Sequence, residues 1–419
     1  MINEQRAGKF YGWSVVRAAF VLAIFGWGLG FYGPPIFLSV IRETRGWPLV
    51  LISAAVSVHF LAGAIAGANL HAAHRRFGVA GVTKAGALSA AAGIMGWALA
   101  SAPWQLFVAA LLSGMGWGTM SAAALNAIVS PWFARSRPAA LGMAYNGGSV
   151  GGIIFSPLWV AAIGGLGFAL ATSLIAAVML ITLWLLASRV FSKTPESMGL
   201  RPDGDVHGVP AVAINAPDAK PLPGALLWRD RKFITLCAGT LLGLFAQIGL
   251  MAHLFSLLVP ALGAQQAGLA LALITVMAIT SRTLLGWLMP LHADRRLIIC
   301  GGYVAQCAGS VALVLAGGTN IPLLIAGVVL FGAGFGNAVS MPPLIAQMEF
   351  RQEDVARVTS LVVGIAQGGY AIAPAFYGLI REFTTPAAGI ASGEAPMLYA
   401  AAALTQGLAI VMYLMGRRR

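Results

Sequence analysis

The residue with the clearest chemistry is Arg282, because it lies inside an apolar stretch that offers it no acidic partner. All 13 Asp and Glu residues fall, on the hydropathy pattern, in tails or connecting segments. A lone arginine at membrane depth costs about 2.5–3.5 kcal/mol even on the mildest insertion scale. Its guanidinium group stays charged at physiological pH and matches a carboxylate with two parallel hydrogen bonds. We therefore expect Arg282 to bind a substrate carboxylate. The structural alternative is that it caps backbone carbonyls or stacks on an aromatic ring.

Two histidines in apolar stretches are the other groups that could titrate there. With no carboxylate in these stretches, His59, His253 and the substrate itself are the available proton carriers. Each histidine also has a structural interpretation, as a hydrogen bonder to a backbone carbonyl or a neighbouring helix. The residues lead to the hypothesis that an organic anion moves together with a proton. Uniport or anion exchange fits the sequence almost as well.

Further polar and aromatic residues in the apolar stretches are candidates for lining a substrate cavity. An amide in hydrocarbon needs a partner, whereas an aromatic ring is also explained by helix packing or lipid contact. The candidates are Trp27, Phe31, Asn126, Tyr145, Asn146, Asn337, Gln367 and Tyr370.

The composition is that of an integral membrane protein. It is 59% hydrophobic and 9% charged, whereas soluble domains carry about 25% charged residues. The formal charge of +13 comes from basic residues scattered over short hydrophilic segments, so we expect no nucleic-acid partner. Cys237, Cys300 and Cys307 lie in apolar runs without metal spacing and are expected to be free thiols. We see no phosphate-binding loop, catalytic triad, carboxylate pair or metal-ligand spacing, and therefore expect neither an enzyme nor a cofactor.

The hydropathy pattern predicts an all-α fold with twelve membrane-spanning helices. An apolar segment of about 20 residues is long enough to cross the bilayer. The first run is too long for a signal peptide, so we expect it to be retained. A proline-containing hydrophilic linker, 192–228, is expected between two six-helix bundles, 1–191 and 229–419. The expected spans are 13–40, 48–70, 79–101, 104–130, 138–164, 167–191, 232–260, 267–290, 297–317, 321–347, 356–380 and 396–415.

The distribution of basic residues predicts that both termini are cytoplasmic. With the N-terminus inside, the outer loops hold only Arg42, Arg45 and Arg381 of the 26 Lys and Arg residues. Arg282 lies within the membrane, and all the others fall on the cytoplasmic side. Because basic residues concentrate in cytoplasmic loops, we expect a multi-pass protein of the cell inner membrane with this orientation.

The two halves repeat at one offset of 220 residues. The offset aligns Arg75-Arg76 with Arg295-Arg296, and Gly114-Met-Gly116 with Gly334-Phe-Gly336. It also places His59 opposite Ile279, one turn before Arg282 and on the same helix face. Parallel repeats related by an axis along the membrane normal imply a central cavity between the halves. We therefore expect His59 to face this cavity from the N-terminal half.

Twelve spans, a 6+6 repeat and a cytoplasmic linker resemble the major facilitator superfamily. The segment Trp132-Phe133-Ala-Arg135-Ser-Arg137, leading into Ala140-Leu141-Gly142, is similar to a signature of monocarboxylate transporters and their bacterial oxalate/formate relatives. The run Ser281-Arg282-Thr-Leu-Leu-Gly286 resembles their Arg-x-x-x-Gly segment, whose arginine binds the substrate carboxylate. Gln247 and His253 are six positions apart, so one straight helix cannot point both inward, and the resemblance favours His253.

The superfamily resemblance also identifies a candidate gating loop after the second and eighth spans. The loop normally carries an acid, which the first copy around Arg75 and Arg76 lacks and the second copy, Asp294-Arg295-Arg296, keeps. A gating ion pair that uses an acid in the N-terminal copy is therefore in doubt. The first span also lacks the lysine and acids of animal monocarboxylate transporters, so their proton handling does not transfer directly.

The sequence thus predicts a monomeric secondary transporter that moves a small organic monocarboxylate by alternating access, with protons as the expected coupling ion. An exporter of drugs or hydrophobic anions is the rival transporter function, since the same aromatic residues would serve it. A carboxylate exchanger or uniporter is the rival mechanism. A membrane-embedded enzyme or a sensor lacks the catalytic residues or the extra domain it would need.

Overall fold

The computed structural model describes residues 10–204, 224–290, 293–385 and 393–417. Within these residues it has twelve helical segments that are long and apolar enough to cross a membrane, which confirms the predicted fold class. The spans are Gly12–Arg45, Leu49–Ala68, Leu70–Leu99, Pro103–Trp132, Arg137–Leu166, Phe168–Phe191, Arg231–Leu262, Ala264–Leu288, Arg295–Leu315, Ile321–Glu349, Gln352–Thr384 and Pro396–Met415.

Several spans are interrupted where the sequence disfavours a continuous helix. The first span consists of α1 (Gly12–Gly30) and α2 (Gly33–Arg45), which divide just before Pro34-Pro35. The eleventh divides into α14 (Gln352–Tyr370) and α15 (Ala373–Thr384), with Pro374 in the first turn of α15. Proline cannot donate its backbone nitrogen and clashes with the preceding turn. The breaks therefore follow directly from the proline positions.

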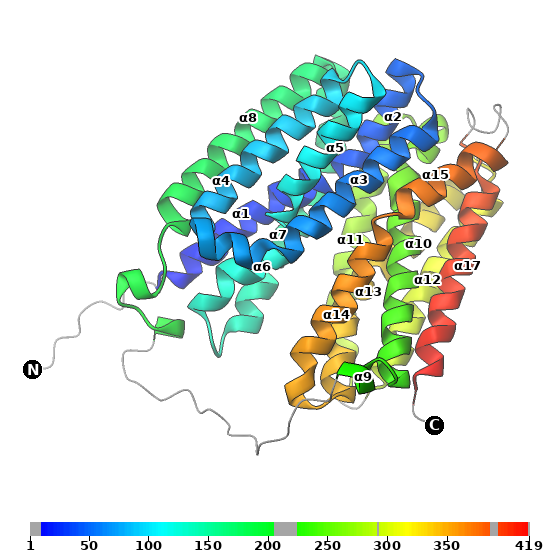
Figure 1. Cartoon of the computed structure of the whole chain (residues 1–419). Helices are drawn as coiled ribbons and strands as arrows, with labels where there is room; N and C mark the ends of the chain where they lie inside the picture. Colours follow the sequence, from blue (N-terminus) through cyan, green and yellow to red (C-terminus); the bar gives the residue numbers. More distant parts are fainter. Residues whose placement is uncertain (1–9, 205–223, 291–292, 386–392, 418–419) are drawn as a thin grey trace, which may run out of the picture.

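The helices form two bundles that lean against each other. The first contains α1 to α3 (Leu49–Ala68), α4 (Leu70–Leu99), α5 (Pro103–Gly118), α6 (Ala122–Val129), α7 (Arg137–Leu166) and α8 (Phe168–Leu186). The second contains α10 (Arg231–Leu262), α11 (Ala264–Leu288), α12 (Arg295–Leu315), α13 (Ile321–Glu349), α14, α15 and α17 (Pro396–Met415). Figure 1 shows the bundles close together at one end and separated at the other, where the described chain begins and ends.

At the closed end, each half caps a helix of the other. The backbone N–H of Val50, in the first turn of α3, donates to Glu382 Oε2 of α15 over 3.0 Å. The backbone N–H of Ala375, in the first turn of α15, donates to Ser57 Oγ of α3 over 2.9 Å. A helix start has unsatisfied N–H groups and a partial positive charge, so both contacts are favourable. We call these two hydrogen bonds the inter-half caps.

Close backbone contacts hold the helices within each half. A Cβ on Gly147 of α7 would collide with the backbone oxygen of Phe20 on α1, and one on Gly114 of α5 would collide with that of His59 on α3. Only glycine allows this separation. The small-residue spacing around Gly114 and Gly147 is therefore part of the packing.

The start of the predicted linker packs against the first bundle. Asp203 accepts the backbone N–H groups of Ala134, Arg135 and Ser136 over 2.8–3.2 Å, just before α7 begins. Burial alone would raise the pKa of this carboxyl group, but the three donors outweigh it and hold the pKa below its usual value. A short helix, α9 (Gly224–Leu227), precedes α10. Residues 205–223 of the predicted linker lie outside the described residues.

Several charge assignments from the hydropathy pattern are wrong. Five acids lie within helices rather than in connecting segments, because those helices extend beyond their apolar stretches: Glu43, Glu349, Glu353, Asp354 and Glu382. Arg381, expected in an outer loop, is in the last turn of α15 with only 1% of its surface exposed.

Candidate functional site

A cavity of about 170 Å³ lies between the two halves. Both bundles contribute to its wall, as the internal repeat predicts. The first bundle supplies mostly aromatic rings, from Trp27, Phe31, Tyr32, Phe60 and Trp117. The second supplies rings and most of the polar groups, from Thr240, Gln247, Phe335, Gln367 and Tyr370.

The aromatic wall is a packed cluster rather than a row of loose side chains. The ring centroids of Trp27 and Trp117 are 4.9 Å apart, and those of Phe31 and Tyr32 are 5.0 Å apart, both edge to face. Phe31 also contacts Phe335 of the other half, with centroids 6.4 Å apart. Edge-to-face packing fixes the orientation of each ring. The wall is therefore rigid enough to select a ligand by shape.

Four of the residues predicted to bind substrate line this cavity: Trp27, Phe31, Gln367 and Tyr370. Trp27 and Phe31 are one turn apart on α1, and Gln367 and Tyr370 are one turn apart on α14. They were candidates because they are polar or aromatic residues in apolar stretches, with members of each pair at helical spacing.

Arg282 lies beside the cavity without lining it. Its Nε donates to the backbone oxygen of Gly336 over 3.2 Å, and Phe335 and Ala338, close to Gly336 on α13, line the cavity. Its charge also acts on Tyr32, another lining residue. Within the described part of the chain, no acidic side chain pairs with Arg282 and its two terminal nitrogens donate to no protein atom. The guanidinium therefore keeps free the fork that a carboxylate would take.

His59 does not face the cavity, contrary to the expectation from the repeat. Its Nε2 contacts the backbone oxygen of Gly30 and its Nδ1 contacts Ser113 Oγ, both at 2.8 Å. A carbonyl oxygen only accepts, so Nε2 carries the proton and Nδ1 accepts from Ser113. Both ring nitrogens therefore make hydrogen bonds that join α1, α3 and α5. This agrees with the structural interpretation of His59 as a hydrogen bonder between neighbouring helices.

His253 also lies away from the cavity, and Gln247 takes the place expected for it. Gln247 lines the cavity with 1% of its surface exposed, whereas His253 is completely buried against α15, where its Nε2 contacts the backbone oxygen of Pro374 at 3.0 Å. The six-residue spacing did place the two on different faces of α10. The preference for His253 rested on the family resemblance, and the hydropathy of the two faces gave no means of choosing.

The cavity-facing Gln247 is held by other amides of the second bundle. Its Nε2 lies 3.4 Å from the backbone oxygen of Phe335, and its Oε1 lies 3.5 Å from Gln306 Nε2 on α12. Further along, Ser310 donates to Gln406 Oε1 over 3.1 Å. These buried amides connect α10, α12 and α17 behind the cavity. They are recognisable in the sequence only as isolated polar residues in apolar helices.

The remaining predicted amides and Tyr145 lie around the cavity rather than on its wall. Asn126 Nδ2 donates to Tyr145 OH over 2.5 Å, which joins α6 to α7 next to the lining residue Ala122. Asn337 is buried and donates to Ser281 Oγ over 2.9 Å, which fixes α11 at the residue before Arg282. Asn146 is exposed.

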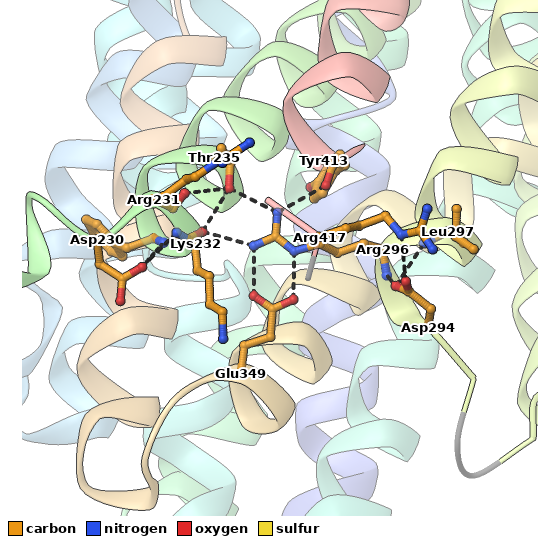
Figure 2. Close-up of polar contacts among 11 residues, drawn as sticks. Asp230, Arg231, Lys232, Thr235, Asp294, Arg296, Leu297, Glu349, Tyr413 and Arg417 are labelled. Atoms are coloured by element: carbon orange, nitrogen blue, oxygen red, sulfur yellow. Dashed lines mark hydrogen bonds and ion pairs between the residues drawn. The ribbon is translucent and has the colours of Figure 1, made fainter. Parts of the chain in front are cut away.

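Two of the predicted gating residues of the second copy, Asp294 and Arg296, belong to a charge cluster at the open end, shown in Figure 2. Buried Arg296 makes two hydrogen bonds to Glu349 of α13, of 2.7 and 2.8 Å. Its other donors reach Thr235 Oγ1 and Lys232 O of α10 and Tyr413 O of α17, over 3.0–3.3 Å. One guanidinium thus joins four helices of the same half.

Asp294, the predicted gating acid, caps α12 and forms an ion pair with Arg417. It accepts the N–H groups of Arg296 and Leu297 over 2.9 and 3.3 Å, and Arg417 Nε over 2.7 Å. Partial burial would raise its pKa, but the bonds from Arg417 and the two backbone groups hold the pKa below its usual value. All these partners belong to the second half. In this conformation the cluster stabilises one bundle instead of joining the two.

The other three gating candidates make fewer contacts. Arg75 and Arg76 are exposed near the start of α4, before the break at Gly78, and Arg76 lies over the Phe77 ring at 5.2 Å. Arg295 has a buried Nε without a partner among the described residues. The first copy of the loop thus shows no counterpart of the Arg296–Glu349 pair within the described chain.

The site can therefore enclose a small molecule between aromatic rings and amides, with a free cationic fork next to it. Within the described residues, no three His, Cys, Asp or Glu side chains are grouped to hold a metal ion. Cys237, Cys300 and Cys307 are free thiols.

Comparison with known proteins supports a transporter. The family model described as Major Facilitator Superfamily matches residues 18–374. A search of curated proteins finds no match. Among solved structures, a D-xylose-proton symporter is similar with a TM-score of 0.72 and 16% identity, covering 96% of this chain and 97% of its own. The nucleoside transporter NupG is similar with a TM-score of 0.70 and 14% identity, covering 97% of this chain and 100% of its own.

A third solved structure is a bacterial homolog of the human lysosomal transporter Spinster, in an inward-facing and occupied conformation. Its TM-score is 0.66 at 14% identity, covering 98% of this chain and 97% of its own. At such low identity these likenesses show the fold alone. They do not confirm the monocarboxylate subgroup suggested by the sequence motifs.

Proposed function

The chain belongs to the Major Facilitator Superfamily of membrane transporters, and from this premise we propose that it carries a small organic monocarboxylate by alternating access. The observation that carries the proposal is the guanidinium of Arg282. It lies next to the central cavity, has one bond to a backbone oxygen and has no acidic partner among the described residues. A carboxylate supplies the missing charge and the matching pair of acceptors.

The size of the cavity favours a small substrate over the rival drug exporter. Pockets for drug-sized ligands measure about 300–1,000 Å³, and the cavity here measures about 170 Å³. Gln247 and Gln367 would hydrogen-bond the polar end of the substrate, and Trp27, Phe31 and Tyr370 would enclose its carbon skeleton. Arg282 would turn towards the carboxylate from its position beside Gly336.

Transport would require the molecule to alternate between this conformation, which is closed at one end, and one that is closed at the other end. We propose that both termini are cytoplasmic, so that this conformation is open to the cytoplasm, and that the protein acts as a monomer in the inner membrane. Proton symport is the proposed coupling, and exchange or uniport are its rivals. Uptake into proteoliposomes with an imposed pH gradient separates these mechanisms, because only symport responds to the gradient directly.

The decisive experiment is Arg282→Lys. Lysine keeps the positive charge but loses the planar fork, so we expect carboxylate uptake into proteoliposomes to fall at least about tenfold, the loss of one strong hydrogen bond. The control is Arg295→Lys, at a position outside the cavity, which should retain uptake. Uptake by Arg282→Lys at the wild-type rate, with equal protein in the membrane, would contradict the assignment.

A further inference from the structure

The closed end holds a buried arginine that the central site does not use. Arg381 of α15 has 1% of its surface exposed. Its Nη1 donates to Ser256 Oγ over 2.6 Å, and its buried Nε has no partner in the described part of the chain. Among the described residues no carboxylate forms an ion pair with it, since the adjacent Glu382 accepts from Val50 instead. A buried guanidinium without a directly paired carboxylate is costly, so an anion bonded to Arg381 would be stabilised there.

His253 belongs to the same group. The hydroxyl group of Ser256, which accepts the hydrogen bond from Arg381, donates to the backbone oxygen of His253 over 2.8 Å. On α15, a Cβ at Gly378, one turn before Arg381, would lie 3.6 Å from Cε1 of His253. Gly378 also packs against the side chain of Ser53 on α3 of the other half. The group therefore lies at the surface where the two halves meet.

The hydrogen bond of His253 leaves one ring nitrogen ready to accept a proton. Nε2 contacts the backbone oxygen of Pro374 at 3.0 Å, and a carbonyl only accepts, so Nε2 carries the proton of the neutral ring. Nδ1 is buried and has no partner among the described residues. A second proton on Nδ1 would make this nitrogen a donor for an anion.

The charges around His253 decide when that proton can bind. Burial of the ring is the main obstacle to a further positive charge, and Arg381 of α15 and Arg42 of α2 add to it. Glu382 of α15 partly offsets the charge of both arginines. Tyr377 of α15 and Tyr399 of α17 are also buried, and the hydroxyl group of Tyr399 has no hydrogen-bond partner among the described residues. An anion next to Arg381 would offset the positive charges and compensate the buried charge on the ring, so the anion and the proton should bind together.

We infer that Arg381, Ser256 and His253 form a second recognition site for the substrate carboxylate, which binds there together with a proton on Nδ1 of His253. The carboxylate accepts from Arg381 Nε and from the newly protonated Nδ1. It reaches the site when the halves separate between α3 and α15. The inference rests on the proposed function for the class of anion, and it assigns the coupling proton to a group outside the central cavity.

Binding to purified full-length protein tests this site. Lactate and pyruvate serve as probes between pH 5.5 and 7.5, where both stay ionised, with chloride as the inorganic control. Binding is measured as thermal stabilisation, which follows ligand concentration and affinity. In Arg282→Lys we expect remaining lactate or pyruvate binding that strengthens as pH falls, approaching about tenfold per pH unit because one proton accompanies each anion. Adding Arg381→Gln should abolish this binding.

A second pair of variants separates the proton from the anion. His253→Gln keeps a donor for Pro374 but cannot take up the proton, so in the Arg282→Lys background its binding should no longer strengthen at low pH. Ser256→Ala leaves both charges in place but removes the hydroxyl group that positions Arg381, and should weaken binding about 2- to 10-fold, the loss of one hydrogen bond. If Arg381→Gln fails to fold, Ser256→Ala replaces it as the variant that should weaken lactate or pyruvate binding at the second site.

The outcomes distinguish this site from the central one. If the wild type binds lactate or pyruvate and Arg282→Lys alone abolishes all binding, the second site is overturned and the proposed function stands. If Arg381→Gln abolishes binding and Arg282→Lys has no effect, the second site stands and the central assignment fails. Arg381-dependent binding of chloride alone overturns the carboxylate as its ligand. Absence of binding in every variant overturns both.

Discussion

At the scale of single residues, the sequence showed which polar residues lie in apolar helices. It did not show which way their side chains face. Arg282, Gln247 and His253 all stand out as polar residues in apolar helices. Only Gln247 lines the cavity, while Arg282 lies beside it and His253 faces α15. Helical spacing gives the angle between two residues but not which of them faces inward, because both faces of α10 are apolar and buried. That choice depends on the neighbouring helices.

Gln247 provides the prediction at this scale. Gln247→Leu keeps the approximate volume and removes both hydrogen-bonding groups from the cavity wall. A hydrogen bond to a charged group contributes about 1.5–3 kcal/mol, so we expect the KM for carboxylate uptake to rise by roughly 10- to 100-fold.

The matched control is Gln306→Leu, which removes the amide behind Gln247 but does not touch the cavity. We expect a smaller rise in KM. Equal effects of the two substitutions would mean that Gln247 acts through packing, and an unchanged KM in Gln247→Leu would exclude contact with substrate.

At the scale of helices, the sequence predicted most of what the structure contains. Twelve apolar runs give twelve spans, and Pro34 and Pro374 mark real interruptions. The contacts between helices could not be predicted from the sequence. Arg296 was expected at a gate, yet its partner is Glu349, 53 residues away on α13, and nothing in the sequence singles out that acid. Long-range pairing is a property of the packed bundle, so local patterns cannot supply it.

The Arg296 cluster carries a prediction on stability. Breaking a buried ion pair by removing one partner costs about 3–5 kcal/mol, because the other charge stays unpaired. We expect Arg296→Gln to lower the free energy of unfolding by about this amount, measured by denaturant unfolding of the purified protein. Arg295→Gln is the control, since Arg295 donates to no described protein atom, and it should stay close to the wild type. Equal stability of the two variants would contradict the role given to Arg296.

At the scale of the whole molecule, the conformation depends on contacts between the halves. The inter-half caps join α3 to α15, and Thr275 of α11 donates to Tyr32 OH over 3.0 Å. The cluster around Arg296 makes no such connection, which leaves the other end free to separate. The repeat in the sequence predicted that two similar halves enclose a cavity. It could not predict which end is closed, because a transporter of this architecture adopts both states and one sequence encodes both.

The inter-half caps give the prediction at this scale. Removing both, in Ser57→Ala with Glu382→Ala, deletes two hydrogen bonds of about 0.5–1.5 kcal/mol each. The equilibrium should move by about 5- to 150-fold towards the state that is open at this end. Spin labels on cysteines at positions 44 and 383, in a variant without the native cysteines, should then report longer distances.

Thr384→Ala is the control, because Thr384 donates to Ile380 within its own helix. Its label distances should match those of the unsubstituted labelled protein. Unchanged distances in the double variant would show that other contacts hold the halves together.

The two inter-half caps also lie at different depths. Val50 and Ser57 are seven residues apart on α3, about 10 Å along the helix axis, and Glu382 and Ala375 have the same separation on α15. If the halves tilt apart from the outer rim, the bond at Glu382 stretches first and the bond at Ser57 last. A half-released intermediate then exists in which the rim admits water and solutes as far as Ser53 and Gly378, while the deeper bond still seals the passage. The membrane would therefore never be breached by a continuous pore during the exchange of states.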